Sequence, residues 1–132
     1  MRNQEIAKIF RELADILEFR GENRYRVRAY RRGAQSLEEY PREVAELPDR
    51  ELLQIPGVGQ ELARKIREFV ASGTIASHLR MKEETPPGLA ALLRVPGLGA
   101  KTALLLFETL EIADLDGLEK AAREHRLAGL PG

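Results

Sequence analysis

A chain of 132 residues, with its lysines and arginines balanced by aspartates and glutamates, is long enough for one compact domain or for two very small ones. It has no cysteine, which excludes disulfides and thiolate zinc sites and fits a reducing compartment, so a cytoplasmic protein is expected. No apolar run is long enough to span a bilayer and no signal-peptide core opens the chain, so no membrane partner is expected.

Two long helices are expected first. Over residues 3–19 one apolar stripe recurs at helical spacing and ends at Gly21; it consists of Ile6, Ile9, Phe10, Leu13, Ile16 and Leu17. A second helix over residues 23–39 carries on one face the apolar residues Val27, Tyr30, Ala34 and Leu37. Pro41 stops this helix, and a short third helix over residues 43–53 is expected to break near Pro48.

Positive charge is concentrated around the second helix. Residues 20–32 hold six arginines and one acid, although the net charge of the chain is zero. Arg24, Arg28 and Arg31 share a helical face, and Arg26 and Arg32 flank it. A solvated surface with ion pairs is the alternative, but acids are almost missing from this segment, so a phosphate-contacting ridge is favoured.

A repeat follows. The segment IPGVGQELARKIREF, residues 55–69, returns forty residues later as VPGLGAKTALLLFETL from Val95. Both copies read aliphatic-Pro-Gly-aliphatic-Gly and open directly into an amphipathic helix.

This pattern is typical of a backbone site for an anion. Proline starts the turn, and the glycines at 57, 59, 97 and 99 allow the main chain to approach a ligand closely. The unpaired N–H groups and the dipole of the next helix then favour a phosphate, without reading any base. A simple tight turn between packed helices is the alternative. A Walker-type loop is excluded because Ala100 separates Gly99 from Lys101 and no strand precedes them.

The remaining segments complete an all-α reading. Helices are expected over residues 75–84, 89–94 and 114–126, with a linker at 85–88 and with His78 and His125 on the surface. The two histidines lie far apart in sequence without a matching carboxylate pattern, so no catalytic zinc is expected. The predicted fold is a small helical bundle with two helix-hairpin-helix motifs, divided into domains at 1–84 and 85–132.

The segments YRVRAYRRGAQSL, IPGVGQELARKIREFVASG and VPGLGAKTA resemble, in order and spacing, the amino-terminal region of family X DNA polymerases, the group of DNA polymerase beta and the bacterial polymerase X enzymes. The resemblance implies a lyase-type domain followed by the start of the fingers, from a nucleotidyltransferase of base excision repair. It implies that the first hairpin grips the strand downstream of a gap and the second grips the primer strand. It also implies a monovalent cation, K⁺ or Na⁺, at the hairpin carbonyls of Leu53, Ile55, Val58, Leu93, Val95 and Leu98.

The family's polymerase chemistry is not expected from this chain. It contains no Gly-Ser motif followed by an Asp-x-Asp pair, which the family uses to hold Mg²⁺ in its palm. The closing LAGLPG is similar to the opening of another hairpin, so the chain is expected to be a fragment without polymerase activity. A monomer is expected.

By resemblance, Lys65 is the candidate Schiff-base lysine of a 5′-deoxyribose phosphate lyase, with Tyr30 as its aromatic neighbour. The chemistry needs an amine that can lose its proton, which lysine supplies and arginine does not. Glu61, Thr74 and Ser77 stand where beta-type members carry lysines, and this weakens the pocket, while Arg26 keeps the charge at another phosphate position. The alternative is an ordinary lysine on a DNA-facing helix.

Three functions therefore remain open. The first is a sequence-independent DNA-binding module for gapped or nicked duplex, the second is the lyase acting through Lys65, and the third is a scaffold for protein interactions. The candidate DNA contacts are Arg24, Arg26, Arg28, Arg31, Gly57, Val58, Gly59, Arg64, Gly97, Leu98, Gly99, Lys101 and Thr102.

Overall fold

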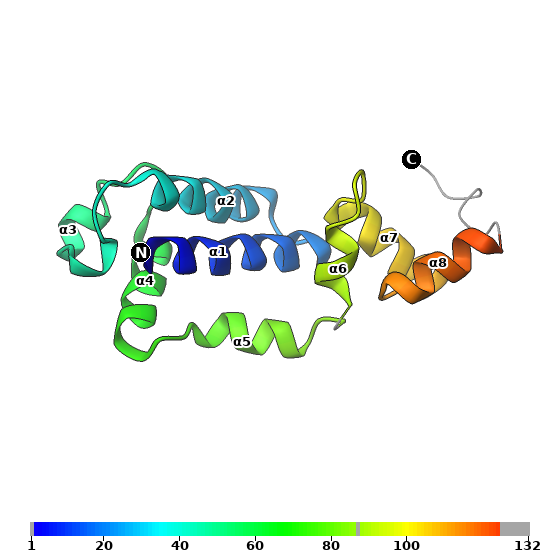
Figure 1. Cartoon of the computed structure of the whole chain (residues 1–132). Helices are drawn as coiled ribbons and strands as arrows, with labels where there is room; N and C mark the ends of the chain where they lie inside the picture. The colour runs from blue at the N-terminus through cyan, green and yellow to red at the C-terminus, as the bar shows by residue number, and fades with distance from the viewer. Residues whose placement is uncertain (1, 87, 125–132) are drawn as a thin grey trace.

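The computed structural model describes residues 2–86 and 88–124. The regular elements of these residues are all helices, with no strand among them, which confirms the all-α prediction (Figure 1). The elements are α1 Arg2–Phe19, α2 Arg24–Glu39, the 3₁₀ turn η1 Val44–Glu46, α3 Asp49–Leu52, α4 Gln60–Ser72, α5 Ala76–Glu83, α6 Leu89–Leu93, α7 Ala100–Leu110 and α8 Leu115–Arg123.

Helix α1 lies at the centre of the molecule, and the other helices are arranged around it and at its two ends. Figure 1 shows α2 and α5 running along opposite sides of it, α3 and α4 at the end where the chain starts, and α6, α7 and α8 at the other end. The main core lies where α1, α2, α4 and α5 meet, and every residue of the apolar stripes predicted for α1 and α2 is buried in it or packs against it, except Ile16, which is buried outside this cluster. Phe10 of α1 meets Tyr30 of α2 edge to face, with ring centroids 5.4 Å apart.

The ends of these helices lie close to the positions that the sequence predicts. Gly21 adopts a positive φ of 73° in the turn between α1 and α2, and the Asn23 side chain caps α2 by accepting a hydrogen bond from the Tyr25 N–H at 2.8 Å. The break predicted near Pro48 is present as the step from η1 to α3.

The start of α1 is fastened by a buried amide. The Asn3 side chain donates to the Arg42 carbonyl at 2.7 Å and accepts from the Val44 N–H at 2.9 Å, and Asn3 is 2% exposed. This pair of bonds joins α1 to the segment that leads into the first hairpin.

The far end of α1 carries a second, smaller core. Phe19 packs against Leu89 of α6 and Ala103 of α7, and its ring lies 5.8 Å from that of Phe107. A third cluster joins α7 to α8 through Leu106, Ile112 and Ala121. Phe19 therefore links the two predicted domains, and their boundary at residues 84 and 85 stays a prediction.

The prediction of a surface position for His78 is wrong. Its side chain is buried between α5 and α1, where Nε2 lies 2.6 Å from the Glu12 carboxylate, while Leu79 beside it is half exposed. His125 and the LAGLPG segment lie outside the described residues, as does the predicted end of the last helix at 126. None of the described helices is long and apolar enough to cross a membrane.

Candidate functional site

The two Pro-Gly-x-Gly segments fold into the same backbone turn. Gly57 and Gly97 adopt left-handed φ values of 84° and 82°. In the first turn the Val58 N–H donates to the Ile55 carbonyl, and in the second the Leu98 N–H donates to the Val95 carbonyl, both at 3.0 Å. A residue with a β-carbon would be strained at either glycine, which accounts for the repeated sequence.

Each turn presents unpaired N–H groups at the start of a helix. Gly59 and Gly99 are the N-caps of α4 and α7, and neither helix has a side chain that caps it. Within residues 2–86 and 88–124, no group accepts a hydrogen bond from the N–H of Gly57, Gly59, Gly97 or Gly99. These donors and the two helix dipoles form two equivalent sites of positive potential.

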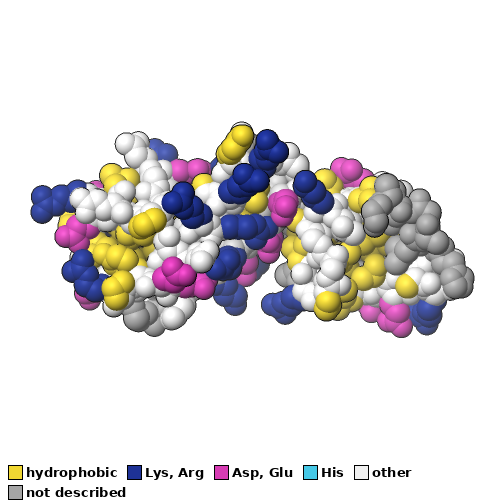
Figure 2. Space-filling model, turned by 90° about the horizontal axis from the view of Figure 1, so that it is seen from above, with side chains coloured by type: hydrophobic (Ala, Val, Ile, Leu, Met, Phe, Trp, Pro, Cys, Tyr) yellow, Lys and Arg dark blue, Asp and Glu magenta, His cyan; other side chains and the backbone are white. Residues whose placement is uncertain are grey.

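An open groove of about 690 Å³ lies between the first turn and α2. One wall is the turn from Leu53 to Gly59, and the other is formed by Tyr25, Arg28, Ala29 and Arg32. Figure 2 shows lysine and arginine side chains gathered over this part of the molecule, on the face that α2 forms. The groove therefore combines backbone donors with guanidinium groups.

The arginine ridge predicted on α2 is divided by its neighbours. Arg24 and Arg28 are exposed, but Arg31 turns to α1 and pairs with Asp15 at 3.0 Å and with Glu18 at 2.9 Å. The sequence expectation that acids were missing overlooked these two, because they come from another helix. The DNA-contact role of Arg31 stays a prediction, but its charge is already balanced.

Arg32, which was expected to flank the ridge but was not among the candidate DNA contacts, stands in the groove beside Arg28. Neither arginine forms an ion pair with any described residue. The sequence did hold the signal, since Arg32 follows Arg28 by four positions and so shares its face.

The second turn has fewer charges around it. Lys101 and Thr102 are exposed in the first turn of α7, and Arg94 is exposed before it. Arg64, another candidate, is exposed on α4, while Arg67 one turn later is held by Asp49 and by the Leu47 carbonyl. The two turns thus share their backbone and differ in the side chains that surround them.

Comparison with known proteins agrees with this duplicated architecture. The helix-hairpin-helix domain family matches residues 1–75, which is more than half of the chain. The chain belongs to the helix-hairpin-helix domain family. A SAM-like helix-hairpin-helix tandem matches residues 89–132, so both predicted motifs are confirmed.

A longer relative covers the same two motifs. Over all 132 residues the chain is 30% identical to the DNA polymerase/3′-5′ exonuclease PolX of Bacillus subtilis (strain 168). The chain spans 23% of the length of that protein. The predicted resemblance to the amino-terminal region of a family X polymerase is confirmed by this match together with the helix-hairpin-helix matches.

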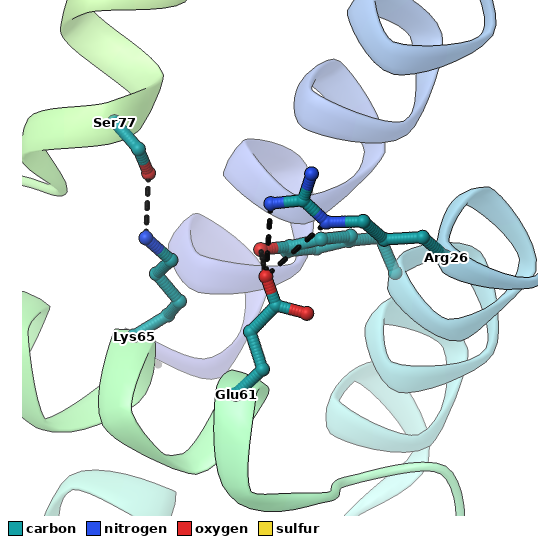
Figure 3. Close-up of polar contacts among 5 residues, drawn as sticks. Arg26, Glu61, Lys65 and Ser77 are labelled. Atoms are coloured by element: carbon teal, nitrogen blue, oxygen red, sulfur yellow. Dashed lines mark hydrogen bonds and ion pairs between the residues drawn. The ribbon is translucent and has the colours of Figure 1, made fainter. Parts of the chain in front are cut away.

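Next to the first helix-hairpin-helix turn lies a polar cluster between α2 and α4 (Figure 3). Glu61 accepts two hydrogen bonds from the Arg26 guanidinium, at 2.9 and 3.3 Å, and one from the Tyr30 hydroxyl at 3.3 Å, all on the same oxygen Oε1. Burial of Tyr30, with the charge of Glu61 nearby, raises the pKa of Tyr30 to about 12. Tyr30, which was expected on the apolar face of its helix, is buried in the core, and its hydroxyl reaches this cluster.

Lys65 stands one turn after Glu61 on α4. Its ammonium group donates to the Ser77 hydroxyl of α5 at 2.7 Å (Figure 3). Thr74 is exposed in the connection between α4 and α5. The Schiff-base role of Lys65 stays a prediction: borohydride should trap the chain on DNA that carries a 5′-deoxyribose phosphate, and an adduct that survives Lys65→Ala contradicts the assignment.

The carbonyls expected to hold a monovalent cation differ in how many hydrogen bonds they already accept. Within the described residues, those of Leu53, Val58, Leu93 and Leu98 accept no hydrogen bond, so their lone pairs are available. Those of Ile55 and Val95 each accept one and keep a second lone pair. Carbonyl oxygens of this kind are suitable ligands for K⁺ and Na⁺. Among the described residues, no cluster of three or more His, Asp or Glu side chains could hold a metal ion.

Proposed function

We propose that this chain is a sequence-independent DNA-binding module of a gap-filling repair polymerase of family X, and that it grips gapped duplex through its two hairpins. The observation that carries the proposal is the duplicated turn. Each copy aims unpaired backbone N–H groups and a helix N-terminus outward, and this combination favours a phosphate over any neutral ligand.

The arrangement of the two turns supports a duplex as the ligand. In Figure 1 both lie on the side of α1 that α2 occupies, at opposite ends of the bundle. Two separate backbone grips on one side suit two positions along a nucleic acid backbone better than one small anion. The groove with Arg28 and Arg32 adds guanidinium contacts at the first grip only.

A monovalent cation is proposed at each turn when DNA is bound. The carbonyls of Leu53, Ile55 and Val58 in the first turn, and of Leu93, Val95 and Leu98 in the second, would hold it. The ion would supply positive charge between the carbonyl oxygens and a phosphate, so that the phosphate can approach the turn. Mg²⁺ would belong to the palm of the longer polymerase, for which this chain has no motif.

Equilibrium binding to labelled duplexes tests the proposal. Gapped, nicked and intact duplexes of two unrelated sequences are titrated with the chain over a range of salt concentrations. We expect gapped or nicked duplex to bind more tightly than intact duplex, equally for both sequences, and to weaken steeply as salt rises because counterions are released. Binding that is flat in salt, or a strong difference between the two sequences, would contradict the proposal.

One variant distinguishes the DNA-binding proposal from the alternative of a protein-interaction scaffold. Arg28→Glu with Arg32→Glu places two acids in the groove and should abolish the binding to gapped duplex. Circular dichroism checks that this variant keeps its helices. If the charge reversal leaves DNA affinity unchanged, the groove has no part in DNA binding and a protein-interaction role is favoured.

A further inference from the structure

The cluster of Arg26, Tyr30 and Glu61 beside the first turn is a site for an anion that the chain fills with its own carboxylate. Two N–H groups of Arg26 and the Tyr30 hydroxyl converge on a single oxygen of Glu61 (Figure 3). Tyr30 is 1% exposed and its ring is fixed against Phe10, so its hydroxyl is held in place. Arg26 and Glu61 themselves are about 40% exposed, so solvent and a ligand reach the cluster.

The cluster adjoins the turn that is proposed to hold DNA. Glu61 is the second residue of α4, two positions after the N-cap Gly59, and Arg26 lies two positions before Arg28 of the groove. Lys65 follows Glu61 by one helical turn and reaches the neighbouring helix α5. A strand that ends at the first turn would therefore bring its terminal group close to these side chains.

The charge of Glu61 decides which terminal group is tolerated. A terminal phosphate carries up to about two negative charges at neutral pH, whereas a phosphate inside the strand carries one and a terminal hydroxyl carries none. Without Glu61, a guanidinium, a hydroxyl and a nearby ammonium would favour the phosphate end. With Glu61 the guanidinium is already paired, and the carboxylate repels a second anion.

We propose that Glu61 is a specificity-determining residue that closes this anion site and makes the DNA grip indifferent to a terminal phosphate. The inference rests on the proposed function, since it concerns the end of a bound strand. It assigns Glu61 an active part in selection, beyond the absence of a lysine at that position.

Binding to gapped duplexes that differ only at the strand end tests this inference. One duplex carries a 5′-phosphate in the gap, one a 3′-phosphate and one only hydroxyl ends. The wild-type chain should bind all three within about twofold. Glu61→Gln keeps the size of the side chain and removes its charge, and it should favour one phosphorylated duplex by roughly five- to tenfold, a gain of the size typical of a charge-assisted hydrogen bond.

Two controls separate this effect from a general loss of negative charge. Glu38→Gln removes a carboxylate of similar exposure that pairs with Arg11 on α1, and it should raise all three affinities equally. Adding Arg26→Ala to Glu61→Gln should remove the new preference. Glu61→Ala serves as a second variant if Glu61→Gln unfolds, with folding checked by circular dichroism.

The outcomes distinguish the two proposals. A wild-type chain that binds none of the duplexes overturns the proposed function and this inference with it. A wild-type chain that binds them but prefers a phosphate end by more than about twofold overturns only the inference. The same holds if the ratio of affinities is unchanged in both Glu61 variants.

Discussion

The side chain of Arg32 packs against the position that a β-carbon on Gly57 would take, with its Cγ 2.9 Å and its Cδ 3.2 Å from that position. The aliphatic stem of the arginine thus covers the glycine of the first turn, and its guanidinium stays in the groove. At the second turn no atom of the described residues lies within 4 Å of the corresponding position on Gly97. Gly57 is therefore packed against the Arg32 side chain of α2, while Gly97 has no such contact among the described residues.

Alanine at these two glycines should separate backbone strain from this packing. Both have positive φ, so either substitution should cost roughly 1 kcal/mol of unfolding free energy. Gly57→Ala must also displace the Arg32 stem, and we expect it to cost about 1 kcal/mol more than Gly97→Ala and to weaken DNA binding further. Urea unfolding and duplex titration measure the two effects. Equal losses would show that the Arg32 contact adds nothing.

The unpaired arginines of the groove should dominate the salt dependence of DNA binding. Arg28→Ala and Arg32→Ala should each lower the affinity for gapped duplex several-fold and reduce the slope of log K against log salt by about one, because each removes one phosphate contact. The slope is measured from titrations at four or more salt concentrations.

Arg31→Ala is the matched control for these variants. Its guanidinium is occupied by Asp15 and Glu18, so its loss should change the salt slope by much less than one and should instead weaken the packing of α2 on α1 slightly. A slope change as large as that of Arg32→Ala would show that Arg31 contacts a phosphate despite its ion pairs.

Local patterns in the sequence predicted most of the fold. The apolar stripes of α1 and α2 are buried or pack on the core because spacing along one helix determines its inner face. The Pro-Gly-x-Gly repeat predicted both turns, because a left-handed backbone at Gly57 and Gly97 is a local requirement. Helix ends were placed within one or two residues by Gly21, Asn23 and Pro48.

These local patterns did not predict which side chains meet between helices. The acids that pair with Arg31 lie on α1, and the one that pairs with Arg26 lies on α4, so the local excess of arginine did not report the number of unpaired charges. His78 is buried because Glu12 of α1 faces it, and the sequence of its short helix holds no sign of that partner. Partner identity is a tertiary property, which is why candidate side chains were predicted less well than backbone turns.

The buried amide of Asn3 should contribute more to stability than any surface ion pair. Asn3→Ala leaves the Arg42 carbonyl and the Val44 N–H without their partner, and we expect a loss of about 1–3 kcal/mol. The ion pair between Arg11 and Glu38 is more than 40% exposed, so Arg11→Ala should cost less than about 1 kcal/mol and serves as the comparison. Thermal and urea unfolding measure both. A larger loss for Arg11→Ala would contradict the ranking.

Tyr30 should make the fold sensitive to high pH. Burial and the Glu61 carboxylate raise the pKa of Tyr30 from its ordinary 10.0 to about 12, so the folded chain holds the proton that the unfolded chain releases. The stability associated with neutral Tyr30 is therefore complete below pH 10 and is lost as the pH rises from 10 towards 12. Integrated over that interval the loss is roughly 2 kcal/mol.

Tyr30→Phe isolates this contribution. The chain has three tyrosines, so the difference in tyrosinate absorbance between the wild type and Tyr30→Phe follows Tyr30 alone. The variant gives up the hydroxyl bond to Glu61, yet its unfolding free energy should fall less steeply than that of the wild type above pH 10. Glu61→Gln should lower the pKa of Tyr30, because a neighbouring negative charge is removed. A Tyr30 that ionises at its ordinary pKa of 10.0 would show that neither burial nor Glu61 acts on its hydroxyl.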